Sequence, residues 1–86
     1  MLEVMIADIY WDNEYWCIKK VDSIKDLKRV LKYADGSVKN IIVDLKDCDD
    51  IKDTVETLFR EFIWIDKVLI KEQKNLIGIY ERNALL

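Results

Sequence analysis

The sequence predicts an α/β two-layer sandwich, in which two helices cover one face of a five-stranded mixed sheet. Two segments repeat apolar residues at helical spacing, and five others are short and rich in β-branched or aromatic residues. These segments follow one another in the order β-β-α-β-α-β-β. Because the joins between them are short and nothing resembles a linker, we expect residues 1–86 to form a single compact α/β domain.

The chain is predicted to open with a β-hairpin. Residues 3–11 and 14–21 are both rich in β-branched and aromatic residues, and Asp12-Asn13 between them suits a two-residue turn with left-handed backbone. This turn sets the register of the hairpin. We therefore expect three cross-strand pairs, which are Ile9 with Trp16, Tyr10 with Tyr15, and Ala7 with Ile18.

A first helix is predicted to begin after Ser23, whose hydroxyl is suited to an N-cap. Asp26, three residues later, completes a weaker form of the capping box. Gly36 tolerates left-handed backbone, so we expect Asp35-Gly36 to end the helix with Gly36 at the C-cap. The apolar residues at helical spacing are Ile24, Leu27, Val30, Leu31 and Ala34.

A strand and a second helix are predicted next. The nearly continuous apolar run Ile41-Ile42-Val43, with Leu45, is typical of a strand buried on both faces. Asp49 or Asp50 then suits the N-cap of the clearest amphipathic helix in the chain. Its apolar residues are Ile51, Val55, Leu58, Phe59, Phe62 and Ile63.

A second hairpin, with strands at residues 66–72 and 76–82, is predicted to complete the sheet. The two strand–helix–strand crossovers make the second, third and fourth strands parallel neighbours, and right-handed crossovers place both helices on one face. The other face then stays open, although its strands carry apolar residues. An open apolar face of this kind usually marks an interaction site.

The composition excludes many catalytic sites. The chain has no histidine, no proline and only two glycines, so a Ser-His-Asp triad, a Cys–His dyad or a histidine metal site cannot form within it. We therefore expect a protein that is not an enzyme and uses no cofactor. The net charge of −3, from 14 basic and 17 acidic residues, neither favours nor excludes nucleic acid.

The apolar runs are too short for a membrane span, which takes about 20 residues. The first eight residues lack the basic flank of a signal peptide. We therefore expect a cytoplasmic protein in which Cys17 and Cys48 are free thiols. Cys17, on a predicted strand, is expected to pack as a small hydrophobic residue.

Function is therefore expected to lie on the protein surface, in the binding of another protein. We expect a small regulatory or inhibitory protein, of the kind found as viral or mobile-element accessory proteins, that forms a homodimer sheet to sheet or binds another protein partner. The alternative is that the aromatic residues only stabilise the first hairpin and that the helices and the C-terminal residues cover more of the sheet. The predicted interface residues are Tyr10, Trp11, Tyr15, Trp16, Ile77 and Ile79.

A basic stripe on the first helix supports a second hypothesis, nucleic-acid binding. Lys25, Lys28, Arg29 and Lys32 lie opposite its apolar residues, and such stripes can follow a phosphate backbone. Acidic residues interrupt the stripe and no aromatic residue is clearly placed for base stacking. A solvated helix face is the simpler interpretation.

An acidic stretch after the central strand supports a third hypothesis. Asp44, Asp47 and Asp49 follow the carboxyl end of that strand, where open α/β sheets bind ligands, and hard cations prefer carboxylate oxygens. They could hold magnesium for a phosphoryl-transfer or nuclease-type reaction. Alternatively, they could form an acidic patch that docks onto a partner protein. The simpler interpretation is that they cap the second helix and face the positive end of its dipole.

Overall fold

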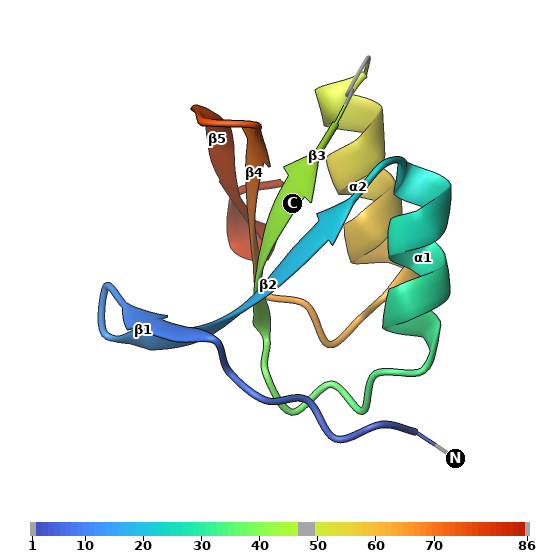
Figure 1. Ribbon diagram of the computed structural model, residues 1–86, viewed down its shortest axis with the longest axis vertical. Helices are drawn as coiled ribbons and strands as arrows, with labels where there is room; N and C mark the ends of the chain where they lie inside the picture. Colours follow the sequence, from blue (N-terminus) through green and yellow to red (C-terminus); the bar gives the residue numbers. More distant parts are fainter. Residues whose placement is uncertain (1, 47–49, 86) are drawn as a thin grey trace.

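The computed structural model describes residues 2–46 and 50–85, and these form one five-stranded sheet with two helices (Figure 1). The predicted order β-β-α-β-α-β-β is confirmed, and a short 3-10 helix, Arg82–Leu85, follows the last strand. Within the described residues, no helix has the length and apolar character needed to cross a membrane. The elements are β1 (Ile9–Trp11), β2 (Glu14–Val21), α1 (Ile24–Lys32), β3 (Asn40–Leu45), α2 (Ile51–Glu61), β4 (Lys67–Glu72) and β5 (Asn75–Glu81).

The sheet has the strand order β1-β2-β3-β4-β5, so neighbours in the sequence are also neighbours in space. β2, β3 and β4 run parallel, while β1 and β5 join the sheet as antiparallel hairpin strands. Both helices lie on one side, as expected of right-handed crossovers (Figure 1). The core between sheet and helices contains apolar residues of β3, β4 and both helices, such as Ile41, Val43, Leu58 and Val68.

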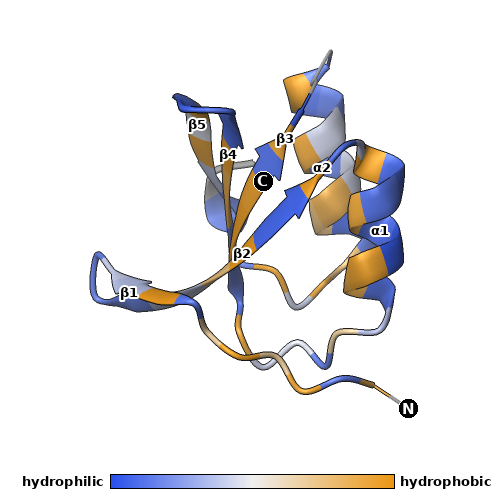
Figure 2. Ribbon diagram, in the orientation of Figure 1, coloured by the Kyte–Doolittle hydropathy of each residue, from blue (hydrophilic) through white to orange (hydrophobic). Residues whose placement is uncertain are grey.

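Both helices have the predicted amphipathic pattern, which appears as alternating hydrophobic and hydrophilic bands in Figure 2. Their predicted N-caps are also confirmed. The hydroxyl of Ser23 accepts a hydrogen bond from the backbone N–H of Asp26, and the carboxylate of Asp50 accepts one from Asp53. Each cap satisfies a backbone donor that the first helical turn leaves free.

The predicted end of α1 is wrong. The helix ends at Lys32, so Ala34 lies outside it, and Gly36 has the expected left-handed backbone (φ +78°) but lies beyond the cap. The physical reason is a pairing with the N-terminal segment. Glu3 donates its backbone N–H to the carbonyl of Tyr33 at 2.6 Å and accepts from the N–H of Asp35 at 2.9 Å, which draws the chain out of the helix.

The predicted end of α2 is also wrong, because the helix ends at Glu61 and Ile63 is exposed. Phe62 still packs against the core. The guanidinium of Arg82 binds the carbonyls of Phe59 at 2.9 Å and Phe62 at 3.0 Å. These contacts satisfy the C-terminal carbonyls of α2 and fix where the helix stops.

The first strand is much shorter than the predicted residues 3–11. The pairs of Ile9 with Trp16 and Tyr10 with Tyr15 are confirmed, but β1 spans only three residues and Ala7 does not join the ladder. The carboxylate of Asp8 explains this ending, because it accepts a hydrogen bond from the backbone N–H of Ile18 at 2.7 Å. The side chain thus takes the place of a main-chain partner.

Asp35 ties the N-terminal segment to the loop after α1, and this gives a testable pH dependence. Its carboxylate accepts hydrogen bonds from the N–H and hydroxyl of Ser37 and from the N–H of Met5. The hydrogen bonds from Ser37 are the main reason why the pKa of Asp35 lies below its ordinary value of 3.8. The folded protein therefore binds this proton more weakly than the unfolded chain does.

We predict that this stabilisation is complete above the unfolded-state pKa and is lost as the pH falls through the lowered folded-state pKa. Asp35→Asn should remove this part of the acid dependence and speed amide hydrogen exchange at Met5 near neutral pH. Exchange measured by NMR, with the cap variant Asp50→Asn as control for the loss of a carboxylate elsewhere, tests this. Unchanged exchange at Met5 would contradict the assigned role.

Candidate protein-interaction surface

The strand register arranges the sheet face opposite the helices, here called the open face, in rows that cross the strands. The middle row is entirely apolar, because Ile18 pairs with Ile42, Ile42 with Leu69, and Leu69 with Ile79. Paired residues share a face and lie side by side. Ile42 and Leu69 belong to a cluster separate from the core under the helices, which confirms that this row faces away from them.

A second row, here called the acidic row, lies at the amino ends of the parallel strands. Lys67 forms ion pairs with Glu14 at 2.7 Å and with Glu81 at 3.6 Å. The hydrogen bond to Glu14 raises the pKa of Lys67, so the ammonium stays charged across the physiological range. Two carboxylates around one ammonium leave this end of the open face with one net negative charge.

A third row, here called the basic row, lies at the carboxyl ends of the parallel strands. Lys20 pairs in register with Asp44, and Asp44 with Lys71. Lys71 forms an ion pair of 3.8 Å with Asp44. Lys74 in the turn between β4 and β5 lines the same groove as Lys71. Three lysines and one aspartate give this end a net charge opposite to that of the acidic row.

A groove of about 390 Å³ crosses the open face from β1 to the β4–β5 turn. Most of its walls are apolar side chains, and Lys71 and Lys74 of the basic row stand at one end. In Figure 1, the β1–β2 hairpin projects away from both helices. Ile9 and Trp11 of β1 line the groove. The lining residues are Ile9, Trp11, Ile18, Ile42, Leu69, Lys71, Lys74 and Leu76.

The prediction that Trp16 is an interface residue is wrong, because only 1% of it is exposed. Its indole N–H donates to the carbonyl of Trp11 at 3.0 Å, and the two rings lie 5.5 Å apart. Trp16 packs with Ile42 and Leu69 as the floor of the open face. Trp11 packs against this ring and is itself left 45% exposed.

The other predicted interface residues divide between two surfaces. Trp11 lies in the groove, Ile79 lies in the middle row, and Ile77 lies beside the β-bulge of β5; all three are exposed. Tyr10 and Tyr15 pair with each other across the hairpin, with ring centroids 4.8 Å apart. Strand alternation turns these two tyrosines to the side opposite the groove.

Several groove residues, among them Ile18, Leu69 and Leu76, are not among the interface residues that the sequence predicts. Period-2 alternation in the strands carries that signal, but it shows only which residues share a face of one strand. The register between strands decides which of them form a band. Between the parallel strands, it pairs residues 24 or more positions apart, such as Ile18 with Ile42.

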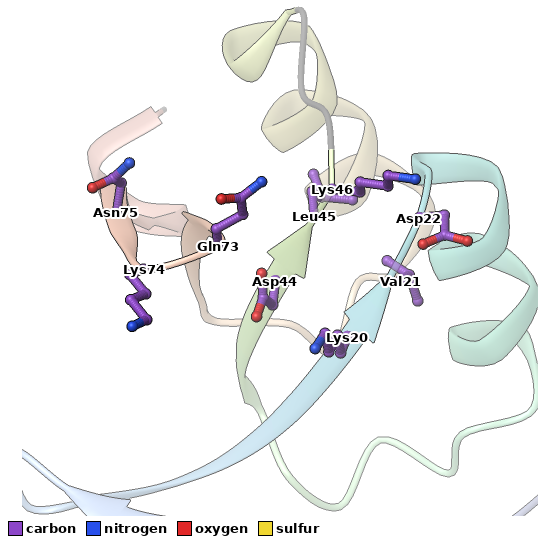
Figure 3. Close-up of a pocket in the computed structure, with 9 residues that line it drawn as sticks. All are labelled: Lys20, Val21, Asp22, Asp44, Leu45, Lys46, Gln73, Lys74 and Asn75. Carbon is purple, nitrogen blue, oxygen red and sulfur yellow. The ribbon is translucent and has the colours of Figure 1, made fainter.

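A second hollow, of about 480 Å³, lies where the magnesium site was predicted (Figure 3). Figure 3 shows its lining residues coming from the ends of β2 and β3 and from the β4–β5 turn. Asp44 lines it beside Lys20, while Asp47 and Asp49 lie outside the described residues. Within residues 2–46 and 50–85, no three potential ligand side chains are grouped closely enough for a metal ion. Magnesium binding stays a prediction.

The basic stripe of α1 lies on the outer surface, and acidic residues pair with part of it. Lys28 contacts Glu61 of α2 at 3.4 Å, and Arg29 contacts Asp26 at 3.8 Å. Lys32 lies over the ring of Tyr33. Lys25 is exposed as well. Nucleic-acid binding by these residues also stays a prediction.

Cys17 packs in the sheet as the sequence predicts. Its thiol is buried and donates to the carbonyl of Ile6 at 3.1 Å. Burial is the main reason why the pKa of Cys17 is raised, and Asp8 adds to the effect while Lys19 opposes it. The protonated, covered thiol is therefore a poor nucleophile. Cys48 lies outside the described residues.

Comparison of the chain with protein-family models, with curated proteins and with solved structures gives no match.

Proposed function

We propose that this protein is a non-catalytic interaction protein that binds another protein chain through its open sheet face. The observation that carries this proposal is the apolar groove, which neither helix covers. Around it the middle row and the groove walls expose Ile9, Trp11, Ile18, Leu76 and Ile79 to solvent. Covering such side chains gains roughly 25 cal/mol for each Å² of apolar surface removed from water.

The arrangement of the groove supports binding to protein more than binding to a small polar molecule. Its polar groups are two lysine ammonium groups at one end, and the rest of its lining is aliphatic or aromatic. Protein interfaces share this pattern of an apolar centre with charged residues at the rim. Trp11, with its ring partly exposed, has the side chain most often found at binding hot spots.

Site-specific photocrosslinking tests the proposal. A benzophenone amino acid replaces Ile79 on the open face, or Val30 on α1 as the control; the two are 46% and 43% exposed. Irradiation in the expressing cell should yield a covalent protein adduct at position 79 and little at position 30. Mass spectrometry of the adduct identifies the captured chain. Equal yields at both positions, or none at position 79, would contradict the proposed surface.

A further inference from the structure

We infer that the chain bound by the open face is a second copy of this protein, with its strands antiparallel to those of the first. This inference rests on the proposed function and names its partner. It is argued from the distribution of charge at the two ends of the apolar middle row.

Symmetry limits how two copies can pack open face to open face. A two-fold axis must lie in the plane between the sheets, since an axis normal to that plane would not bring the same faces together. We infer the aligned type of sheet packing, in which the strands of the two sheets stay within about 30° of one another, because orthogonal packing would cross the two apolar middle rows and cover only part of each. The axis therefore runs either along the strands, which brings like ends together, or across them, which brings unlike ends together.

Charge selects between these two axes. The acidic row has two glutamates around Lys67, whereas the basic row and the adjoining turn have three lysines and Asp44. An axis along β3 would place each row over its own copy, with Lys20 opposite Lys71 of the partner subunit. An axis across the strands places the acidic row of each copy over the basic row of the other.

The same axis also fits the apolar middle row. With the axis across the strands, each residue of this row faces its own copy, so Ile18 meets Ile18 of the partner subunit and Ile79 meets Ile79 of the partner subunit. The apolar band is thereby covered along its whole length. One chain thus supplies an apolar centre and complementary charges at both ends, as an isologous interface requires.

Crosslinking through one introduced cysteine tests the arrangement. In a Cys48→Ser background, Ile79→Cys and Ile18→Cys should each give a covalent dimer with a short bismaleimide, because each thiol faces its own copy. Val30→Cys is the matched control on α1, where maleimide should label the thiol without linking two chains. The background protein shows whether the buried Cys17 contributes any product.

Charge reversal gives an independent measurement. The double variant Lys20→Glu/Lys74→Glu should weaken self-association about tenfold at low salt, measured by sedimentation. Each copy loses two lysines, so four charges change sign in the symmetric dimer. Mixing this variant with Glu81→Lys should favour the mixed dimer over either homodimer. Lys25→Glu, which changes an exposed lysine of α1, is the control and should leave association unchanged.

The outcomes separate this inference from the proposed function. Crosslinks that form only when Ile18→Cys is mixed with Leu69→Cys, which flank β3 in the middle row, would place the axis along the strands and overturn the antiparallel arrangement. A protein that stays monomeric at high concentration would overturn self-pairing altogether. If photocrosslinking at position 79 then captures a different chain, the open face remains the interaction surface with another occupant.

Discussion

Replacement of Arg82 by alanine is expected to lower the free energy of unfolding by about 3 kcal/mol, or roughly 15 °C in Tm. The guanidinium donates to three carbonyls, those of Phe59 at 2.9 Å, Phe62 at 3.0 Å and Ile65 at 2.8 Å. It also lies 4.9 Å from the ring of Phe59. Truncation leaves the carbonyls at the end of α2 without these partners and removes a positive charge from the negative end of the helix dipole.

Two variants control this prediction. Arg82→Lys keeps the charge, but a single ammonium cannot reach three diverging carbonyls, so about half of the stability loss should remain. Arg60→Ala removes an exposed arginine of α2 whose guanidinium donates a long hydrogen bond of 3.5 Å to the hydroxyl of Thr57, and it should change stability by less than about 0.5 kcal/mol. Urea unfolding measures the free energy of unfolding of all three variants. Equal effects of Arg82→Ala and Arg60→Ala would show that the cap does not stabilise the fold.

Gly36→Ala is expected to lower the free energy of unfolding by about 2–4 kcal/mol. Gly36 is buried with φ +78°, a backbone conformation that costs an L-residue about 1–2 kcal/mol. A Cβ at this position would also lie 2.8 Å from Cγ and 3.1 Å from Cβ of Trp64. These atoms lie at the base of the indole side chain, which cannot swing away without moving the backbone.

A double-mutant cycle separates the two causes. Trp64→Ala removes Cγ, the closest atom, but not the backbone strain, so Gly36→Ala should cost less in that background while still being destabilising. Gly78→Ala is a second comparison, because Gly78 lacks the positive φ and its added Cβ would meet the far end of the Tyr80 side chain. A loss at Gly36 no larger than that at Gly78 would show that neither strain nor the approach of Trp64 matters.

The order of the elements could be predicted because it depends on short-range patterns in the sequence. Helical spacing, the Ser23 and Asp50 caps, and the Asp12-Asn13 turn are each set by residues within a few positions of one another. The turn residues have φ of 54° and 62°, as a two-residue hairpin of this kind needs. Chirality of the crossovers then leaves little freedom in the topology.

The element ends were predicted less well, because distant residues decide them. Asp8 ends β1 by bonding to Ile18, Glu3 draws the chain from α1, and Arg82 closes α2 from 20 or more positions away. No local pattern indicates such partners. The same holds for Gly36, whose left-handed backbone was predicted but whose contact with Trp64 was not.

For this protein the sequence alone determined the order of the elements, the layer of helices and the presence of one uncovered apolar face. Only the tertiary structure decided what that face presents. Packing against Trp11, Ile42 and Leu69 buries Trp16, and the sheet brings Glu14 to Lys67 across 53 positions. Periodicity is a property of one segment, whereas a surface is made by the pairing of several, and that pairing is fixed only when the whole sheet assembles.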